Sequence, residues 1–333
     1  MNAIPLHRVH ILNHFVAYLQ DLGGKVEYGL TRAQLPGTCI EEPDAFIPSL
    51  GFYDFVGAMS EQVGVEELGF LVGQSVGANL VSDRLEVALQ AEPTLYRGLI
   101  TLQRALEKET SQAGMRLSPV GAGRLRVSYS SSFGPEHVAH YSMIWFSLMG
   151  LIETIRVFTG PIWQPLEIGF AGARLPGQII RDHFLCSRIH AGTNNYVDID
   201  IADLSKPPQK AGSCFEGPLE ADNFLHNLQG SLELLLSTYQ YGQLPSISQV
   251  AEFAGLGVRS LQRQLKSSGV NFSTMLANAR YQGATRLLDN PNARVEDIAY
   301  QLGYSHPTHF SRAFRRFSGV SPLEYRRREN QVN

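Results

Sequence analysis

The first two thirds of the chain mix helical and strand-like patterns of apolar residues. Apolar positions recur at helical spacing in four segments: Leu6–Leu22, Phe52–Val72, Thr94–Thr110 and Glu136–Phe158. Three shorter segments alternate apolar with polar positions or are rich in β-branched residues: Leu125–Tyr129, Leu166–Phe170 and Tyr196–Ile201. This mixture predicts an α/β domain over residues 1–205.

The last third of the chain has helical patterns only. Before it lies SKPPQKAGS, Ser205–Ser213, where prolines and a glycine among small polar residues indicate a linker. We therefore expect an α/β domain at residues 1–205, a linker at 206–228 and an all-α domain at 229–333.

Four leucines near the start of the last third are spaced by three, four and three residues: Leu225, Leu228, Leu232 and Leu235. This spacing puts them on one face of a helix. We expect this helix face to pack within its own domain, and the alternative is that it forms a dimer interface.

The last third also contains an internal repeat. VAEFAGLGVRSLQRQLKSSGV, Val250–Val270, aligns with IAYQLGYSHPTHFSRAFRRFSGV, Ile298–Val320, with two single-residue insertions. The matched pairs are Ala251 with Ala299, Gly255 with Gly303, Leu261 with Phe310, Arg263 with Arg312 and Leu265 with Phe314. Each copy has a short helix, a turn with glycine and a second helix, which is a helix-turn-helix arrangement. A helix within Phe272–Asn290 is expected to connect the two units.

The second copy shows how its second helix should form. Ser305 is expected to cap the helix, and Pro307 falls in the first turn, where no intrahelical hydrogen bond is lost. Phe310, Phe314 and Phe317 form the expected buried stripe.

Polar and basic side chains occupy the opposite face of each second helix. They are Arg259, Gln262, Arg263 and Lys266 in the first copy, and Thr308, His309, Arg312, Arg315 and Arg316 in the second. Arginine can bond bidentately to guanine and glutamine to adenine in the major groove, while other cations bind phosphates. One such helix is most simply a solvated face, but two matched copies favour DNA reading. If both enter successive segments of the major groove, they should stand about one DNA turn, roughly 34 Å, apart.

The charge distribution supports this interpretation. Residues 229–333 hold 12 Lys and Arg against 7 Asp and Glu, a net charge of +5. The rest of the chain holds 16 against 24, a net charge of −8. A basic region joined to an acidic one indicates that one part meets a polyanion.

Other patterns in the sequence point away from enzymes, metals and membranes. The usual acyl-transfer and nucleotide-binding motifs do not occur in their required context. The pairs His306/His309 and His137/His140 lack further ligands at zinc-type spacing, and the three cysteines lie far apart. The longest apolar run, Met143–Leu151, is too short to cross a bilayer, and the N-terminus has no signal-peptide pattern. We expect no catalytic residue, cofactor, metal or membrane span, and a cytoplasmic location.

The C-terminal residues resemble the DNA-binding domain of the AraC/XylS family of bacterial transcription regulators. The resemblance covers Leu232–Arg328 and rests on SISQVAEFAGLGVRSLQRQLK, FSTMLANARYQGATRLL and VEDIAYQLGYSHPTHFSRAFRRFSGVSPLEYR. It implies two helix-turn-helix units in one domain, binding to double-stranded promoter half-sites, and activation through RNA polymerase. The base-reading positions implied by the family are Arg259, Gln262, Arg263, Thr308, His309 and Arg312, and Lys266 and Arg316 complete the expected DNA-binding set.

The chain departs from the family pattern at two helix starts. Gly257 and Val258 stand where a serine cap and a proline are common, and Arg294 occupies a frequent Ser/Thr cap site. Glycine caps a helix nearly as well as serine, so these departures affect the contacts of the first unit rather than the fold.

The N-terminal residues Pro5–Leu204 resemble, more diffusely, the sensor domain of a subgroup of that family. The resemblance rests on the order of elements and on stretches such as GVEELGFLVGQ. It implies an unidentified small-molecule effector and a homodimer. His137, His140 and Tyr141 are candidates for the effector pocket, and an ordinary structural role is the alternative.

An alternative interpretation of the whole chain is a small-molecule-binding protein or enzyme in residues 1–205 with a basic tail that binds nucleic acid without sequence specificity.

Overall fold

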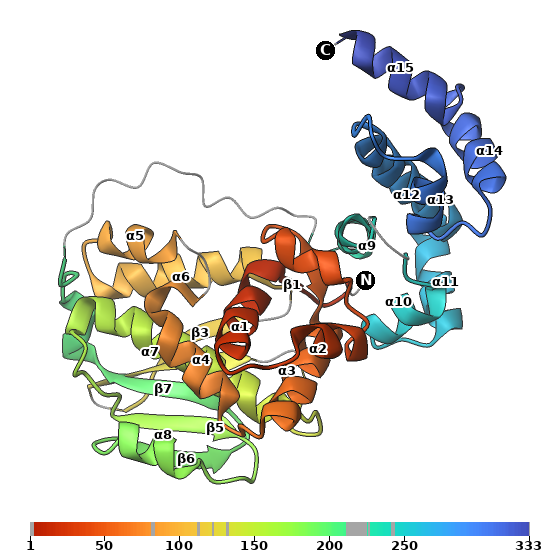
Figure 1. The fold of residues 1–333 in the computed structure, drawn as a ribbon. Coiled ribbons are helices and arrows are strands. Elements are labelled where there is room, and N and C mark those ends of the chain that lie inside the picture. The colour runs from red at the N-terminus through yellow and green to blue at the C-terminus, as the bar shows by residue number, and fades with distance from the viewer. Residues whose placement is uncertain are drawn as a thin grey trace. The chain divides into compact units, whose positions relative to one another are not determined.

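The structure is a computed structural model that describes residues 3–80, 84–111, 114–121, 123–130, 133–210, 225, 227–240 and 244–332. The chain divides into two units (Figure 1). The α/β unit comprises Pro5–Leu35 and Ser49–Asp222, and the helical unit comprises Met1–Ile4, Pro36–Pro48 and Asn223–Asn333. The predicted combination of an α/β region with an all-α C-terminal region is confirmed. Most of the expected linker at 206–228 lies outside the described residues.

A five-stranded sheet forms the base of the α/β unit, in the order β3-β4-β7-β5-β6. Its strands are β3 (Gly114–Pro119), β4 (Arg124–Ser130), β5 (Glu167–Ala171), β6 (Arg188–Gly192) and β7 (Asn195–Asp200). β5 and β6 are parallel, and the other neighbours are antiparallel. β4, β5 and β7 confirm the predicted strands. β3 and β6 were not among the predicted strands. β3 buries only Met115 and β6 buries none of its residues, so burial imposes little pattern on either sequence.

Helices cover the sheet of the α/β unit (Figure 1). They are α1 (Val9–Asp21), α2 (Val26–Arg32), α3 (Ser49–Val63), α4 (Leu68–Val76), α5 (Leu85–Gln90), α6 (Leu95–Glu109), α7 (His140–Thr159) and α8 (Gln178–His183). The helix predicted from Leu6 starts instead as the short strand β1 (Leu6–Arg8) and continues as α1. The helix predicted over Phe52–Val72 is divided into α3 and α4 because Gly64, with φ of +67°, ends the first helix.

Helix α7 is the central element of the α/β unit. An 18-residue window of this 20-residue helix has a mean hydropathy of 1.2, which would be enough to cross a membrane, but 72% of that window is buried inside the protein. It crosses α4 so closely that a Cβ on Gly69 would lie 1.7 Å from the carbonyl oxygen of Ser142. α7 is therefore a core helix, and its hydrophobicity follows from that burial.

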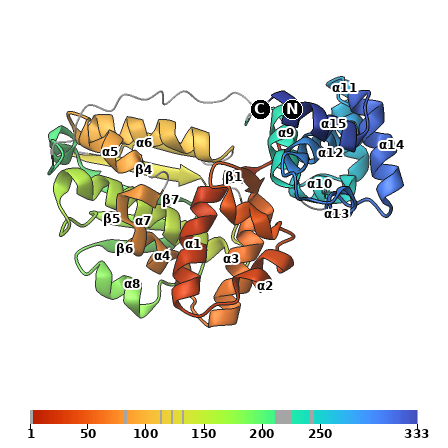
Figure 2. The same cartoon turned by 45° about the horizontal axis from the view of Figure 1, so that its top comes forward.

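The helical unit is built around α12 (Phe272–Leu288), which lies at its centre in Figure 2. The other helices are α9 (Leu228–Thr238), α10 (Ile247–Phe253), α11 (Val258–Ser267), α13 (Val295–Gln301), α14 (Pro307–Ser318) and α15 (Pro322–Val332). The four leucines at the start of the unit, Leu225, Leu228, Leu232 and Leu235, are buried. This confirms that the helix face packs within its own domain for Leu228, Leu232 and Leu235, whereas Leu225 is buried but lies before the start of α9.

Two early segments of the chain also belong to the helical unit. The Ile4 backbone N–H donates to Ser231 Oγ at 2.9 Å. In the strand β2 (Phe46–Pro48), the Phe46 N–H donates to Thr238 Oγ1 at 3.2 Å. Residues far apart in sequence thus complete the core around α9, which the predicted division of the chain did not include.

Candidate DNA interface

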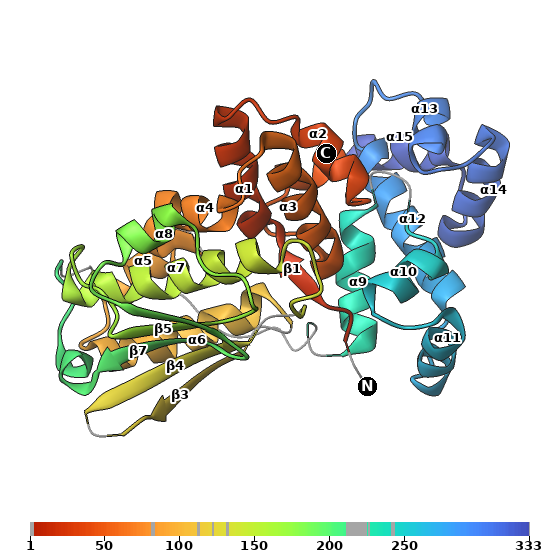
Figure 3. The same ribbon diagram turned by 90° about the horizontal axis from the view of Figure 1, so that it is seen from below.

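The structure contains the two predicted helix-turn-helix units, α10–α11 and α13–α14, on either side of α12 (Figure 3). Both turns use the same backbone geometry, because Gly255 and Gly303 have φ of +63° and +80°. The residue after each glycine donates a backbone hydrogen bond to the buried alanine of the first helix: Leu256 N to Ala251 O at 2.8 Å, and Tyr304 N to Ala299 O at 2.9 Å. The sequence repeat is therefore a structural repeat.

The starts of the second helices differ from one another. Gly257 is the N-cap of α11, as expected, and Pro307 occupies the first turn of α14. The prediction that Ser305 caps α14 is wrong. The N-cap residue is His306, which has extended φ and ψ of −146° and 138° and no capping side-chain bond. Ser305 therefore lies one residue before the cap and outside the helix.

The inner faces of both second helices are apolar. Leu261, Leu265, Phe310 and Phe314 are buried, which confirms four predicted core positions. The prediction that Phe317 is buried is wrong, since this side chain is 45% exposed. Phe317 lies in the last turn of α14, where its ring stacks on Tyr281 of α12 at 5.1 Å between centroids and leaves one side open.

The outer faces of both second helices carry the polar residues expected to contact DNA. All eight are exposed: Arg259, Gln262, Arg263, Lys266, Thr308, His309, Arg312 and Arg316. Within the described part of the chain, no carboxylate forms an ion pair with the four arginines of this set. Their guanidinium donors are available to an external acceptor. We call these eight residues the basic face.

Helix α12 and Arg326 make the contacts that hold the two helix-turn-helix units together. A Cβ on Gly283 of α12 would lie 2.4 Å from the carbonyl oxygen of Gln240, so glycine permits the close approach of these segments. Arg326 of α15 donates to Leu288 O at 3.1 Å and to Ala293 O at 2.7 Å. This role of Arg326 was not predictable from the sequence, because the acceptors are backbone carbonyls of residues 33 to 38 positions away.

The three effector candidates do not converge on one cavity. His137 Nε2 lies 3.2 Å from Asp54 Oδ1, and the Tyr141 hydroxyl accepts a hydrogen bond from Gly177 N at 3.2 Å. The buried His140 contacts two backbone carbonyls, with Nδ1 2.9 Å from Phe133 O and Nε2 3.1 Å from Ala171 O. Of the three, only His140 lines the cleft beside the ends of β3 and β4. These side chains are occupied by protein partners, and an effector role stays a prediction.

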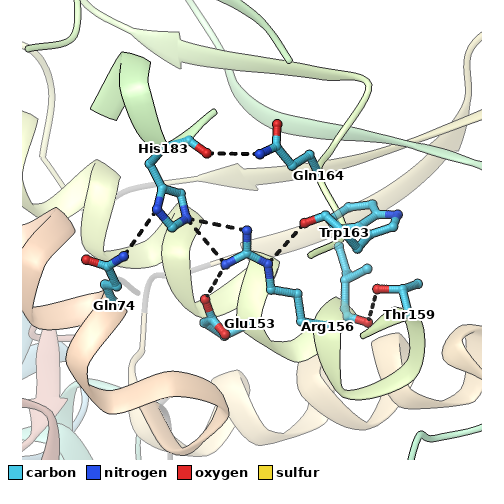
Figure 4. Close-up of polar contacts among 8 residues, drawn as sticks. Gln74, Glu153, Arg156, Thr159, Trp163, Gln164 and His183 are labelled. Atoms are coloured by element: carbon cyan, nitrogen blue, oxygen red, sulfur yellow. Dashed lines mark hydrogen bonds and ion pairs between the residues drawn. The ribbon is translucent and has the colours of Figure 1, made fainter. Parts of the chain in front are cut away.

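A second polar cluster in the α/β unit surrounds Arg156 (Figure 4). Its guanidinium donates to Glu153 Oε1 at 2.8 Å and to Trp163 O at 3.1 Å, and it lies 3.4 Å from His183 Nε2. Gln74 contacts the other ring nitrogen of His183 at 3.1 Å. Burial and the Arg156 charge lower the pKa of His183, which favours the neutral ring. The cluster joins α4, α7 and α8 and is structural.

The stretch GQSVG, Gly73–Gly77, has the letters of a serine hydrolase motif but a different structure. It spans the end of α4 rather than a turn from strand to helix, and Ser75 Oγ donates to Val72 O at 2.8 Å. The exposed nucleophile that this motif requires is therefore not formed.

Comparisons with known proteins agree with this architecture. Residues 250–328 match a helix-turn-helix domain, and residues 23–207 match the N-terminal arabinose-binding domain of AraC transcription regulator. The chain is 33% identical over 345 residues to the ornithine utilization regulator of Pseudomonas aeruginosa, covering 93% of this chain and 95% of that protein. The chain belongs to the AraC family of transcription regulators.

Two further relatives of this AraC-family chain come from Mycobacterium tuberculosis. The HTH-type transcriptional regulator VirS is 23% identical over 320 residues, covering 92% of each chain. An uncharacterized HTH-type transcriptional regulator is 38% identical over 87 residues, and this match spans only 26% of the present chain and 25% of that relative. The relatives are transcription regulators and not enzymes, so the reading of residues 1–205 as an enzyme has no support.

Proposed function

We propose that this AraC-family protein is a sequence-specific DNA-binding activator of transcription that responds to a small-molecule effector. The observation that carries the proposal is the basic face. Two structurally equivalent helices turn Arg263 and Arg312 outward at matched positions, with no carboxylate partner among the described residues. Such donors suit the edges of guanine in the major groove.

The members of the basic face have different proposed roles. Arg259, Gln262, Arg263, Thr308, His309 and Arg312 read bases, while Lys266 and Arg316 bind phosphates. The protein acts in the cytoplasm as a homodimer on repeated promoter half-sites and contacts RNA polymerase. Effector binding shifts the equilibrium between dimer arrangements, which requires different effector affinities in the two states.

The DNA part of the proposal is tested with fragments selected from the host genome by the full-length protein. Gel-shift titrations compare the wild type with Arg263→Ala and Arg312→Ala on a selected fragment and on random DNA. Each variant should lose about 1–3 kcal/mol of binding to the selected fragment and little on random DNA. Arg188→Ala is the matched control, since it removes an exposed arginine from the α/β unit.

Sequence-specific recognition is contradicted if the wild-type protein binds selected and random DNA with equal affinity and with steep salt dependence. The effector part is tested separately, by following gel-shift affinity and oligomeric state across a panel of metabolites. If both stay constant, the effector response is contradicted and regulation by protein abundance is preferred.

A further inference from the structure

A mostly apolar cavity lies inside the α/β unit, between α1, α6 and α7 and the strands β3 and β4. Its walls include Ile11, Leu106, Met143 and Phe146, and the centre of a water-sized sphere can move within about 40 Å³ inside it. No Asp, Glu, Lys or Arg is among the described side chains that line it. None of the three effector candidates from the sequence lines it either.

One end of the cavity is polar because two backbone segments meet there. His7 and Thr110 pair through an isolated antiparallel β-bridge, which turns their side chains to the same side. Both line the cavity. His7 Nδ1 lies 2.7 Å from Ser49 Oγ, and burial lowers the pKa of His7 to about 4, so the ring is neutral at pH 7.

At the polar end of the cavity, the hydroxyl of Thr110 has no described hydrogen-bond partner. Its side chain is only 3% exposed, and Oγ1 is buried with no hydrogen-bond partner in the described part of the chain. The other hydroxyls of the lining are satisfied, since Ser147 Oγ donates to Met143 O at 3.0 Å and also pairs with the Tyr129 hydroxyl. A buried hydroxyl without a partner has lost its hydrogen bonds to water, so a ligand that bonds to it recovers that free energy.

We propose that this cavity binds a neutral, largely apolar small molecule that places one hydroxyl or carbonyl group against Thr110. The assignment deepens the proposed effector response and rests on it for its regulatory meaning. A charged ligand is excluded because the lining offers no counter-ion, and a sugar is excluded because most of its hydroxyls would remain unpaired. The ligand class therefore differs from the arabinose and ornithine in the names of the matched domain and relative.

The test uses full-length protein and four probes: hexan-1-ol, hexanoate, hexylammonium and arabinose. Calorimetric titration and thermal unfolding measure binding. We expect hexan-1-ol to bind and to raise the Tm, and the other three probes to do neither. Absence of hexan-1-ol binding, or equal binding of the charged probes, overturns the proposal.

Two matched variants locate the binding. Thr110→Val should weaken hexan-1-ol binding about five- to tenfold and leave the Tm of the ligand-free protein equal or higher, since an unpaired hydroxyl is removed. Thr154→Val is the control, because Thr154 Oγ1 is also buried without a described partner but lies on α7 outside the cavity lining. Its hexan-1-ol affinity should not change. Leu106→Trp, which fills the cavity, should abolish binding.

The variants also give results that reject the site. If Thr110→Val lowers the Tm of the ligand-free protein and leaves the affinity unchanged, Thr110 serves the fold and the proposal is overturned. The same test separates the cavity from the regulatory function. Hexan-1-ol binding without any change in DNA affinity supports the cavity and contradicts its assignment as the effector site. A gel shift that responds to another metabolite while hexan-1-ol fails to bind overturns the cavity and leaves the regulatory function standing.

Discussion

At the scale of single residues, the surroundings of a side chain decide its role. Arg312 projects from α14 with no carboxylate partner among the described residues, whereas Arg326 donates to the carbonyls of Leu288 and Ala293. Both are arginines near the end of the same basic region. The guanidinium of Arg312 is available to an external acceptor, and Arg326 holds α15 to the turn after α12.

Two serines before helices should differ in their effect on stability. Ser246 forms a capping box at α10, accepting from Gln249 N at 3.3 Å while Gln249 Oε1 accepts from Ser246 N at 2.9 Å. Ser246→Ala should therefore lower the free energy of unfolding of the helical unit by about 1 kcal/mol. Ser305→Ala should change it little, because Ser305 is not the cap of α14. Urea unfolding followed by circular dichroism compares the two, and equal losses would contradict the assignment of caps.

The buried His7 makes the stability of the α/β unit depend on pH. Its pKa falls from 6.5 to about 4 on folding, so the unfolded chain binds more protons between these values. The stabilisation is complete above about pH 6.5 and is lost as the pH falls towards 4, by roughly 3 kcal/mol in total. His183 acts in the same direction, because its pKa is also lowered in the folded protein.

Tryptophan fluorescence reports this change, since both tryptophans, Trp145 and Trp163, lie in the α/β unit. Urea unfolding at pH 7, 5.5 and 4 should show the loss, and His7→Gln should reduce the pH dependence. His190→Gln is the control at an exposed histidine. A slope that His7→Gln leaves unchanged would show that other groups cause the loss.

At the scale of elements, helix α12 determines how the two helix-turn-helix units are held. Three of its four buried residues are small, Ala279, Gly283 and Ala284, so neighbouring segments approach closely. The predicted separation of the two reading helices depends on this packing.

Gly283→Ala should test the role of this close approach. The added Cβ would lie 2.4 Å from the backbone oxygen of Gln240, which has no flexible end to move away. We expect a loss of about 1–3 kcal/mol in the free energy of unfolding. Binding to a selected DNA fragment should weaken more than binding to random DNA, because the spacing of the reading helices changes. Asn278→Ala, an exposed substitution on the same helix, should leave both measurements close to the wild type.

At the scale of the whole molecule, the positive charge that attracts DNA is confined to the C-terminal third of the chain. The C-terminal third carries a net charge of +5 and the remainder −8, so the positive potential is concentrated in the region of the basic face. Phosphate contacts then make binding depend on salt without selecting a sequence.

The double variant Lys266→Ala/Arg316→Ala should reveal these phosphate contacts. The slope of log affinity against log salt concentration should become shallower by about 2, since each neutralised phosphate contributes about 0.9. The ratio of specific to random binding should stay near that of the wild type. A fall in this ratio would instead assign base reading to Lys266 or Arg316. Arg188→Ala, which removes one positive charge outside the basic face, again serves as the control.

The sequence by itself determined the elements whose residues interact with near neighbours in the chain. The 3.6-residue period gave the two helix-turn-helix units, their buried Leu261 and Phe310, and the exposed Arg263 and Arg312. The two-residue period gave β4, β5 and β7. These patterns are readable because burial of one face imposes a regular spacing on each element.

Only the tertiary structure decided the features that depend on residues far apart in the chain. Strand β3 pairs with β4 although few of its side chains are buried, and residues 36–48 join the helical unit through Thr238. The polar end of the apolar cavity exists because residues 7 and 110 meet across a single bridge, and Arg326 finds its acceptors on the backbone. Such contacts depend on which distant segments the folded chain brings together, and the local spacing of apolar residues does not predict which segments meet.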